Sequence, residues 1–327
     1  MNRRVLVTGA TGFAGSHVMD VLLEARVSVR VLVRTTSNLR WIPSEQVEMV
    51  TADVRNAISL RELVKGVSWV FHFGGITRAA SPEEFFRVNT EGTKTLAEAL
   101  LEAAPEDGLF LFCSSLAASG PAPAIEQPRR ESDPPRPITP YGESKLAAER
   151  WLEQAVGSRM RLLTIRPPAI YGPRDEAMLS FFQWVKRGWL PLPPQVGSRV
   201  SLIHARDLAQ GCLTLAEKGE VGIFHFADGV MHSWEDVGEA AGRAMERSLR
   251  TIRVPAWGVR LAGEMGELLG RATGRMPVLN RRQVQDILQP YWICETEKAR
   301  RAGWVPKVRL GEGILQTVTW YQSEGWL

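Results

Sequence analysis

The feature that most constrains the fold is a turn with three glycines near the N-terminus, within residues 5–18. Gly9, Gly12 and Gly15 separate a short β-branched run from a segment whose apolar residues have helical spacing. This pattern predicts a strand, a tight turn and a helix. Because N–H groups at a helix N-terminus attract anions, the turn also predicts a phosphate site. The alternative is a strand-to-helix turn that binds no ligand.

The N-terminal half alternates between short apolar runs and segments with helical periodicity. Alternation of this length predicts βαβ units and a parallel sheet. Residues 120–140 contain seven prolines and are expected to form a loop. The expected strands are 5–7, 27–33, 47–50, 67–73, 109–113 and 160–165, and the expected helices include 59–64, 82–104 and 141–154.

The pattern changes after about residue 170, where tryptophans and clusters of proline and glycine replace the regular alternation. This change predicts a second, smaller lobe folded against the ends of the strands. Residues 200–204 and 223–226 are expected to be strands that return to the main sheet, so that the two lobes interleave.

Composition excludes several classes of protein. The net charge is only +4, and no run of like charges indicates a nucleic-acid partner. No apolar run reaches the ~18 residues of a membrane span, and the early first strand leaves no room for a signal peptide. Cys113, Cys212 and Cys294 are far apart and have no metal-ligand spacing. We expect a cytoplasmic protein with no metal and no membrane or nucleic-acid partner.

Tyr141 and Lys145 lie four residues apart in an expected helix, so their side chains should share one face. An ammonium group beside a phenol stabilises the phenolate, which eases proton exchange by a tyrosine whose ordinary pKa is about 10. The chain has only seven lysines, and the other three tyrosines have no lysine at this offset. The spacing therefore indicates a catalytic pair.

An ordered series of motifs resembles the extended short-chain dehydrogenase/reductase family over essentially the whole chain. The resemblance implies a doubly wound parallel (Rossmann) α/β sheet with an interleaved smaller C-terminal substrate lobe. Residues 1–170 would form the dinucleotide-binding domain, with return strands near 200–228, and residues 171–327 mainly the substrate-binding lobe. The motifs are the turn at 8–15, Asp53 with Val54, Gly74 with Gly75, Val88–Thr93, Ser114 with Ser115, Tyr141 with Lys145, 166–175 and 201–208.

The resemblance also implies roles for individual residues. Tyr141 would be the general acid/base, and Lys145 would lower its pKa and hold the nicotinamide ribose. Ser115, or alternatively Ser114, would hydrogen-bond the reacting oxygen. Asn89 is expected to hold the backbone around the site. The expected cofactor contacts are Gly9, Thr11, Gly12, Phe13, Gly15, Arg34, Asp53, Val54, Gly74, Gly75, Asn89, Tyr141, Lys145 and Pro168.

The residues after the second expected strand favour NADP(H). NAD-binding enzymes usually place an acidic residue there to accept the ribose 2′-hydroxyl, whereas a 2′-phosphate needs a cation. This chain has Arg34 and then Arg40, with no acidic residue nearby. NADP is the expected cofactor and NAD the second choice. The alternative is that Arg34 stacks on the adenine or faces solvent.

Two departures from the family pattern bear on the substrate. Epimerases and dehydratases of nucleotide sugars usually carry Asn at Ala169 and Arg at Val200, and Arg199 should point to the other face of its strand. The expected pocket is instead apolar and aromatic, unless its members simply form the core of the small lobe. The expected substrate contacts are Thr77, Ser115, Ala169, Met178 and Phe182, with Phe181, Trp184, Trp189 and Trp257 nearby.

We therefore expect an NADP(H)-dependent oxidoreductase that interconverts a ketone and a secondary alcohol on a small, largely apolar substrate. This function is similar to that of the dihydroflavonol-reductase and 3-beta-hydroxysteroid-dehydrogenase branches of the family. One alternative is a nucleotide-sugar epimerase or dehydratase with tightly bound NAD(P). A cofactor-sensing protein without activity is disfavoured, because Tyr141 and Lys145 are both present.

The resemblance further implies a homodimer in which two long helices, near residues 90–104 and 141–154, pair across a two-fold axis. The residues considered for this interface, or equally for the internal core, are Leu96, Leu100, Leu146 and Trp151.

Overall fold

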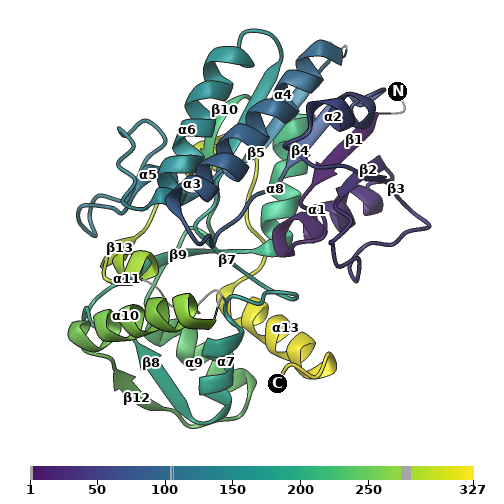
Figure 1. Ribbon diagram of the computed structural model, residues 1–327. Coiled ribbons are helices and arrows are strands. Elements are labelled where there is room, and N and C mark those ends of the chain that lie inside the picture. The colour runs from purple at the N-terminus through teal and green to yellow at the C-terminus, as the bar shows by residue number, and fades with distance from the viewer. Residues whose placement is uncertain (1–2, 104, 106, 274–280) are drawn as a thin grey trace.

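A seven-stranded parallel sheet forms the centre of the larger lobe of this computed structural model, which describes residues 3–103, 105, 107–273 and 281–327 (Figure 1). The strand order is β3-β2-β1-β4-β5-β6-β10, so the direction of winding reverses between β1 and β4. Such a reversal opens a crevice at the carboxyl ends of the strands. The expected doubly wound fold is confirmed. The strands are β1 (Arg4–Thr8), β2 (Ser28–Val33), β3 (Glu48–Thr51), β4 (Trp69–His72), β5 (Leu109–Cys113), β6 (Arg161–Arg166) and β10 (Gly222–His225).

Helices cover both faces of this sheet. Val5 and Val7 of β1 pack in the core beneath α1 and α8, whereas Leu6 packs in the core beneath α2, α4 and α6. Alternating side chains of a strand point to opposite faces, so a sheet covered on both sides needs apolar runs without polar interruption. The helices of this lobe are α1 (Phe13–Glu24), α2 (Ala57–Leu63), α3 (Pro82–Phe85), a π-helical stretch (Phe86–Glu91), α4 (Gly92–Ala103), α5 (Leu116–Ser119), α6 (Pro140–Ala155) and α8 (Ala205–Glu217).

The smaller lobe surrounds a separate apolar core that includes Phe182, Leu190, Val237 and Ile314. Among the described residues, none of the helices combines the length and the apolarity that a membrane span requires. The remaining strands are β7 (Ala169–Tyr171), β8 (Trp189–Leu192), β9 (Arg199–His204), β11 (Met231–His232), β12 (Arg250–Arg253) and β13 (Tyr291–Trp292). The remaining helices are α7 (Leu179–Lys186), α9 (Trp234–Ala244), α10 (Ala256–Thr273), α11 (Arg281–Ile287), α12 (Glu297–Arg301) and α13 (Leu310–Ser323).

The two expected return strands have different outcomes. Residues 223–226 do reach the main sheet, because β10 pairs with β6 in parallel. Residues 200–204 do not, since β9 pairs with β7, β11 and β13 in a separate sheet, and that expectation is wrong. Both segments are short apolar runs, and periodicity alone does not specify the strand that a run pairs with.

The three leucines considered for a dimer interface are buried within their own chain. Leu96 and Leu100 are completely buried in the core between α4 and the sheet, and Leu146 is 7% exposed. Trp151 is partly buried and packs against the same core. A surface formed by the three leucines is therefore excluded, because these side chains already contact their own chain.

Glu149 and Arg166 form a buried ion pair between α6 and β6, with side chains 4% and 3% exposed. Arg166 donates from Nε to Oε1 at 3.0 Å and from Nη2 to Oε2 at 2.6 Å. Ser114 donates to the same carboxylate, and Arg166 Nη1 donates to Ser119 Oγ at 3.1 Å. Ser119 Oγ in turn lies 3.2 Å from Nε2 of His225. This network joins three neighbouring strands to α5 and α6.

Replacing Glu149 with alanine should lower the free energy of unfolding by about 3–5 kcal/mol, because Arg166 would remain buried without a counter-charge. Urea denaturation at constant pH measures this loss. Glu102→Ala is the matched control, since Glu102 pairs with Arg61 at the surface and should change stability far less. Equal losses in the two variants would contradict the importance of the buried pair.

Candidate active site

The glycine turn after β1 borders a cavity of about 540 Å³ at the carboxyl edge of the sheet. Gly9 has a φ of +75°, and a Cβ on Gly15 would lie 2.2 Å from the Gly9 carbonyl oxygen. Gly12 caps α1, whose N-terminus has no side-chain cap and no acidic residue in its first turn. Unpartnered N–H groups facing a cavity suit an anion, so the turn fits a diphosphate group.

Nine of the fourteen expected cofactor contacts line this cavity. Arg34, Asp53, Val54, Gly74 and Asn89 do not line it. Thr77, expected to contact the substrate, lies here instead, because it follows β4, whose end belongs to this crevice. The nine that line it are Gly9, Thr11, Gly12, Phe13, Gly15, Gly75, Tyr141, Lys145 and Pro168.

Asn89 lies behind the cavity and holds the backbone that follows β4. Its Oδ1 accepts from Ile76 N at 2.8 Å, and its Nδ2 donates to Ile76 O at 3.0 Å and to Ser144 Oγ at 3.1 Å. A Cβ on Gly75 would lie 2.9 Å from Asn89 Oδ1 and 3.3 Å from Lys145 Nζ. Gly75 is therefore required for this close packing, and Asn89 has the supporting position that its motif predicts.

His72 is a supporting residue that the sequence did not reveal. Its Nδ1 lies 2.6 Å from Thr8 Oγ1, its Nε2 lies 2.8 Å from Thr93 Oγ1, and Thr8 also accepts from Gly74 N. Burial, with a smaller effect of Lys145, lowers the His72 pKa to about 3. The imidazole is therefore neutral at physiological pH and links β1, β4 and α4 beneath the cavity.

Lys145 is a buried ammonium at the centre of the site. Its Nζ donates to Cys113 O at 2.9 Å and lies 4.9 Å from the centre of the Phe112 ring. Burial lowers the Lys145 pKa, whereas Cys113 and Glu149 raise it. The carbonyl oxygen, the aromatic face and the nearby carboxylate partly replace the water that this charge has lost.

Tyr141 and Ser115 lie where this cavity meets a second one. Burial raises the pKa of Tyr141, whereas its hydrogen bond with Ser115 lowers it. Ser115 caps α5, and its Oγ accepts from Ala117 N at 3.1 Å. The Ser114 hydroxyl is instead bonded to Glu149. Ser115, rather than Ser114, is thus available to act beside Tyr141.

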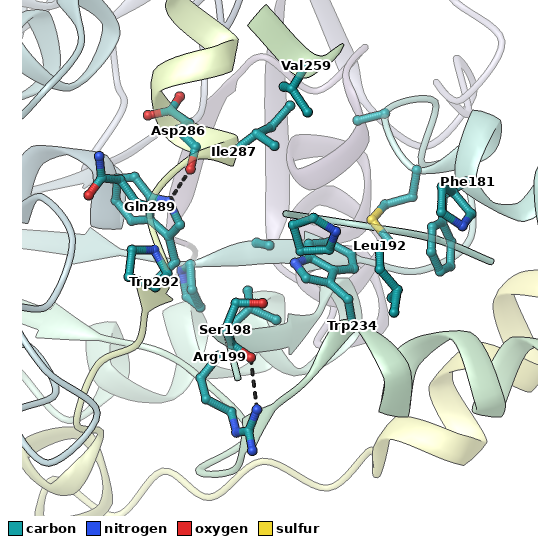
Figure 2. A pocket seen from close by; sticks show the side chains of 18 of the residues that line it. Phe181, Leu192, Ser198, Arg199, Trp234, Val259, Asp286, Ile287, Gln289 and Trp292 are labelled. Atoms are coloured by element: carbon teal, nitrogen blue, oxygen red, sulfur yellow. Dashed lines mark hydrogen bonds between the residues drawn. The ribbon is translucent and has the colours of Figure 1, made fainter. Parts of the chain in front are cut away.

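The second cavity measures about 680 Å³ and is largely apolar (Figure 2). Ser115, Tyr141, Pro168 and Ala177 line both cavities and form the boundary between them. Ala169 and Met178 line the second cavity, as expected. Its other lining residues include Leu116, Phe181, Leu192, Val200, Trp234, Val254, Val259, Ile287, Pro290 and Trp292.

Phe182 was expected to contact the substrate, but it is completely buried and packs against Tyr321. Neighbouring residues on a helix point in directions about 100° apart, so Phe181 faces the cavity and Phe182 faces the core. Trp184 and Trp257 are 46% and 70% exposed, and neither lines the cavity. Apolar composition identified the right lobe and some of its lining residues, among them Met178 and Phe181, but not which other aromatic side chains face the cavity.

The polar side chains of the second cavity are few, and Arg199 is its only basic residue within the described chain. Its Nη1 donates to Ser198 O at 3.0 Å. The guanidinium also lowers the Asp236 pKa, which places it near the start of α9, and Figure 2 shows it pointing away from Trp234 and Asp286. No cation of the described residues therefore faces the interior of this cavity.

Arg34 and Asp53 lie outside the first cavity, near the ends of β2 and β3. Arg34 is exposed, and its backbone N–H donates to Ser37 Oγ at 2.9 Å. A hydrogen bond from Arg55 is the main cause that lowers the Asp53 pKa to about 2. Asp53 therefore stays ionised, and its charge is shared with Arg55.

Four further residues line the first cavity and come from two segments that are far apart in the sequence. They are Arg40, Trp41, Arg174 and Glu176. Arg40 forms an ion pair with Glu176, and Arg174 forms one with Asp20 at 2.8 Å. Both guanidinium groups lie over the Trp41 ring, 4.5 and 5.1 Å from its centre. Arg40 belongs to the basic segment after β2 and Arg174 to the motif at residues 166–175, whereas nothing in the sequence indicated Trp41 or Glu176. Within the described residues, no cluster of His, Cys, Asp and Glu is suited to a metal ion.

Comparison with known proteins agrees with this geometry. The model of the NAD dependent epimerase/dehydratase family matches residues 5–225. A ceramide reductase of Caulobacter vibrioides is 32% identical over 99% of this chain and 96% of its own length. A 4-hydroxy-2-methyl-3-oxo-4-farnesyl-3,4-dihydroquinoline-1-oxide ketoreductase of Stigmatella aurantiaca is 26% identical over 95% of this chain and 94% of its own.

Among solved structures, the UDP-glucose 4-epimerase of Thermus thermophilus, crystallised with NAD, has the same fold. Its TM-score is 0.80 at 24% identity, covering 98% of this chain and 99% of the other. The family match, the relatives and the topology agree. This chain is an enzyme of the NAD dependent epimerase/dehydratase family, within the extended short-chain dehydrogenases/reductases.

Proposed function

We propose that this enzyme is an NADPH-dependent ketoreductase that acts on a long, largely apolar ketone. The observation that carries the proposal is the second cavity, which is apolar, has a volume of about 680 Å³ and opens onto Ser115 and Tyr141. A cavity of this kind buries alkyl or ring carbon favourably and has few polar groups to orient a ligand.

The relatives support the same class of substrate. One is named as a reductase of ceramide, a lipid, and another as a ketoreductase of a compound that carries a farnesyl chain. A nucleotide sugar would bring a diphosphate into the second cavity, where Val200 replaces the usual arginine and Arg199 is turned away. Burying that charge without a cation is costly, so the cavity favours the ketone.

Gly9, Gly12 and Gly15 would hold the cofactor diphosphate, and Lys145 would hold the nicotinamide ribose. When bound, the nicotinamide supplies a hydride for the carbonyl carbon of the substrate. Ser115 would donate a hydrogen bond to the carbonyl oxygen and polarise it, while the Tyr141 hydroxyl transfers its proton to that oxygen.

The charges at the site favour this direction of proton transfer. Burial keeps Tyr141 protonated near neutral pH, as a proton donor must be. The Lys145 ammonium, held by Cys113 O, lines the same cavity as Tyr141 and would stabilise the phenolate that remains after transfer. The low polarity of the cavity strengthens both effects, because water does not screen them.

Arg34 is the proposed contact for the 2′-phosphate that distinguishes NADPH from NADH. It follows β2, has an exposed side chain and has no ion pair among the described residues. Arg40 and Arg174, in contrast, are paired with Glu176 and Asp20. A guanidinium without an ion pair suits a phosphate at this position. Asp53, which follows β3, is instead paired with Arg55.

The purified enzyme should oxidise NADPH when a long-chain ketone is added and should form the secondary alcohol in equal amount. Loss of absorbance at the nicotinamide band together with product analysis measures this stoichiometry. UDP-glucose is the comparison substrate. Its conversion without net change of NADPH, and no reaction with any ketone, would support the epimerase alternative instead.

Tyr141→Phe should lower kcat for ketone reduction by about 100-fold or more, because the proton donor is lost while the ring remains. The KM for NADPH should change little. Tyr291→Phe is the matched control, since Tyr291 lines neither cavity and should retain full activity. Full turnover by Tyr141→Phe would remove Tyr141 from the mechanism.

Arg34→Ala should raise the KM for NADPH about 10-fold or more and leave the KM for NADH unchanged, because only NADPH presents a 2′-phosphate. Steady-state kinetics with both cofactors measure the ratio. Arg150→Ala removes another exposed arginine, on α6, and should leave the ratio unaltered. A wild-type preference for NADH would reject the assignment of Arg34.

A further inference from the structure

One carboxyl oxygen of a residue that lines the second cavity has no hydrogen-bond partner. Asp286, near the end of α11, lines this cavity, and its Oδ1 is inaccessible to water and unpartnered. Its backbone oxygen is engaged, since it accepts from Trp292 Nε1 at 2.9 Å and from Gln289 N at 3.2 Å. Figure 2 shows Asp286 on one wall of the cavity with Ile287, Gln289 and Trp292.

The surroundings of Asp286 do not explain a buried carboxyl. Burial raises its pKa to about 7, and no basic residue of the described part of the chain is among the causes of the shift. Buried polar atoms in native proteins almost always have partners, because leaving one unsatisfied costs stability. Asp286 lines a cavity, so a ligand bound there can provide the missing donor once the carboxyl group rotates toward it.

The position of Asp286 limits where that ligand group lies. Asp286 and Tyr141 line the same cavity, and the Asp286 charge raises the pKa of Tyr141. Phe181 and Leu192 lie on the opposite side of the cavity in Figure 2. A donor bound by Asp286 is therefore near the reacting carbonyl, and the apolar part of the substrate extends toward Phe181 and Leu192.

We propose that Asp286 determines substrate specificity by accepting a hydrogen bond from an N–H or O–H group close to the substrate carbonyl. The substrate class is then a long-chain ketone with an acylamino or hydroxyl group beside the ketone. This inference rests on the proposed ketoreductase function and adds the polar end of the substrate to it. An ionised carboxylate accepts two or more such bonds, so either donor satisfies it.

The test uses pairs of ketones that differ only in the donor. One pair is a long-chain α-acylamino ketone and its N-methyl derivative, and the other is an α-hydroxy ketone and its methyl ether. Wild-type kcat/KM with saturating NADPH should be about 10- to 100-fold higher for at least one donor-bearing ketone than for its methylated partner. The pair with the larger ratio identifies the donor as N–H or O–H.

Asp286→Ala should reduce that ratio to about 1 by slowing the donor-bearing ketone, while the rate with the methylated ketone changes by less than about 3-fold. Asp286→Asn should keep part of the ratio, because its amide oxygen still accepts a hydrogen bond. Gln289→Ala is the matched control from the same wall, and it should leave the ratio intact. Thermal unfolding verifies that each variant folds.

Each other outcome has a distinct meaning. A wild-type ratio near 1 for both pairs, or an equal loss on both members of a pair in Asp286→Ala, overturns the role of Asp286 but leaves the ketoreductase function in place. If Asp286→Ala does not fold, the wild-type ratio and Asp286→Asn decide in the same way. No reaction with any of the four ketones overturns the proposed function itself.

Discussion

The arrangement of the site depends on one close approach of backbone to backbone, at Gly9 and Gly15. A Cβ on Gly15 would lie 2.2 Å from the Gly9 carbonyl oxygen, and a Cβ on Gly9 would lie 2.6 Å from the backbone of Phe73. Helix α1 therefore begins directly against the ends of β1 and β4, where the strand order reverses. Since parallel strands end at the same edge, every group that follows β4, β5 or β6 is delivered to the same crevice.

One face of α6 connects this crevice to the interior of the protein. Tyr141, Lys145 and Glu149 follow one another at intervals of four residues, so they lie in a row along the helix. Tyr141 reaches the cavities, Lys145 is bonded to the end of β5, and Glu149 is paired with Arg166 in the core. The buried ion pair thus fixes the rotation of the helix, and with it the position of the Tyr141 hydroxyl.

Sequence reasoning succeeded where the signal is local. The main sheet, the helix that carries Tyr141 and Lys145, and the supporting place of Asn89 all follow from patterns within short segments. It failed where the outcome depends on distant segments. The pairing of β9, the burial of Phe182 and the position of Asp286 in the second cavity are set by tertiary packing, which no local pattern encodes.

The two cavities differ in charge, and this difference orients the reactants. The first combines the N-terminus of α1, which has no side-chain cap, with the ammonium of Lys145, and both favour phosphate groups. The second is apolar, and its basic side chain is turned outward while Asp286 is left unpartnered. A diphosphate is therefore stabilised on one side of Tyr141 and disfavoured on the other. Because Tyr141 lines both cavities, the reactive ends of a cofactor and of the proposed ketone would meet beside its hydroxyl.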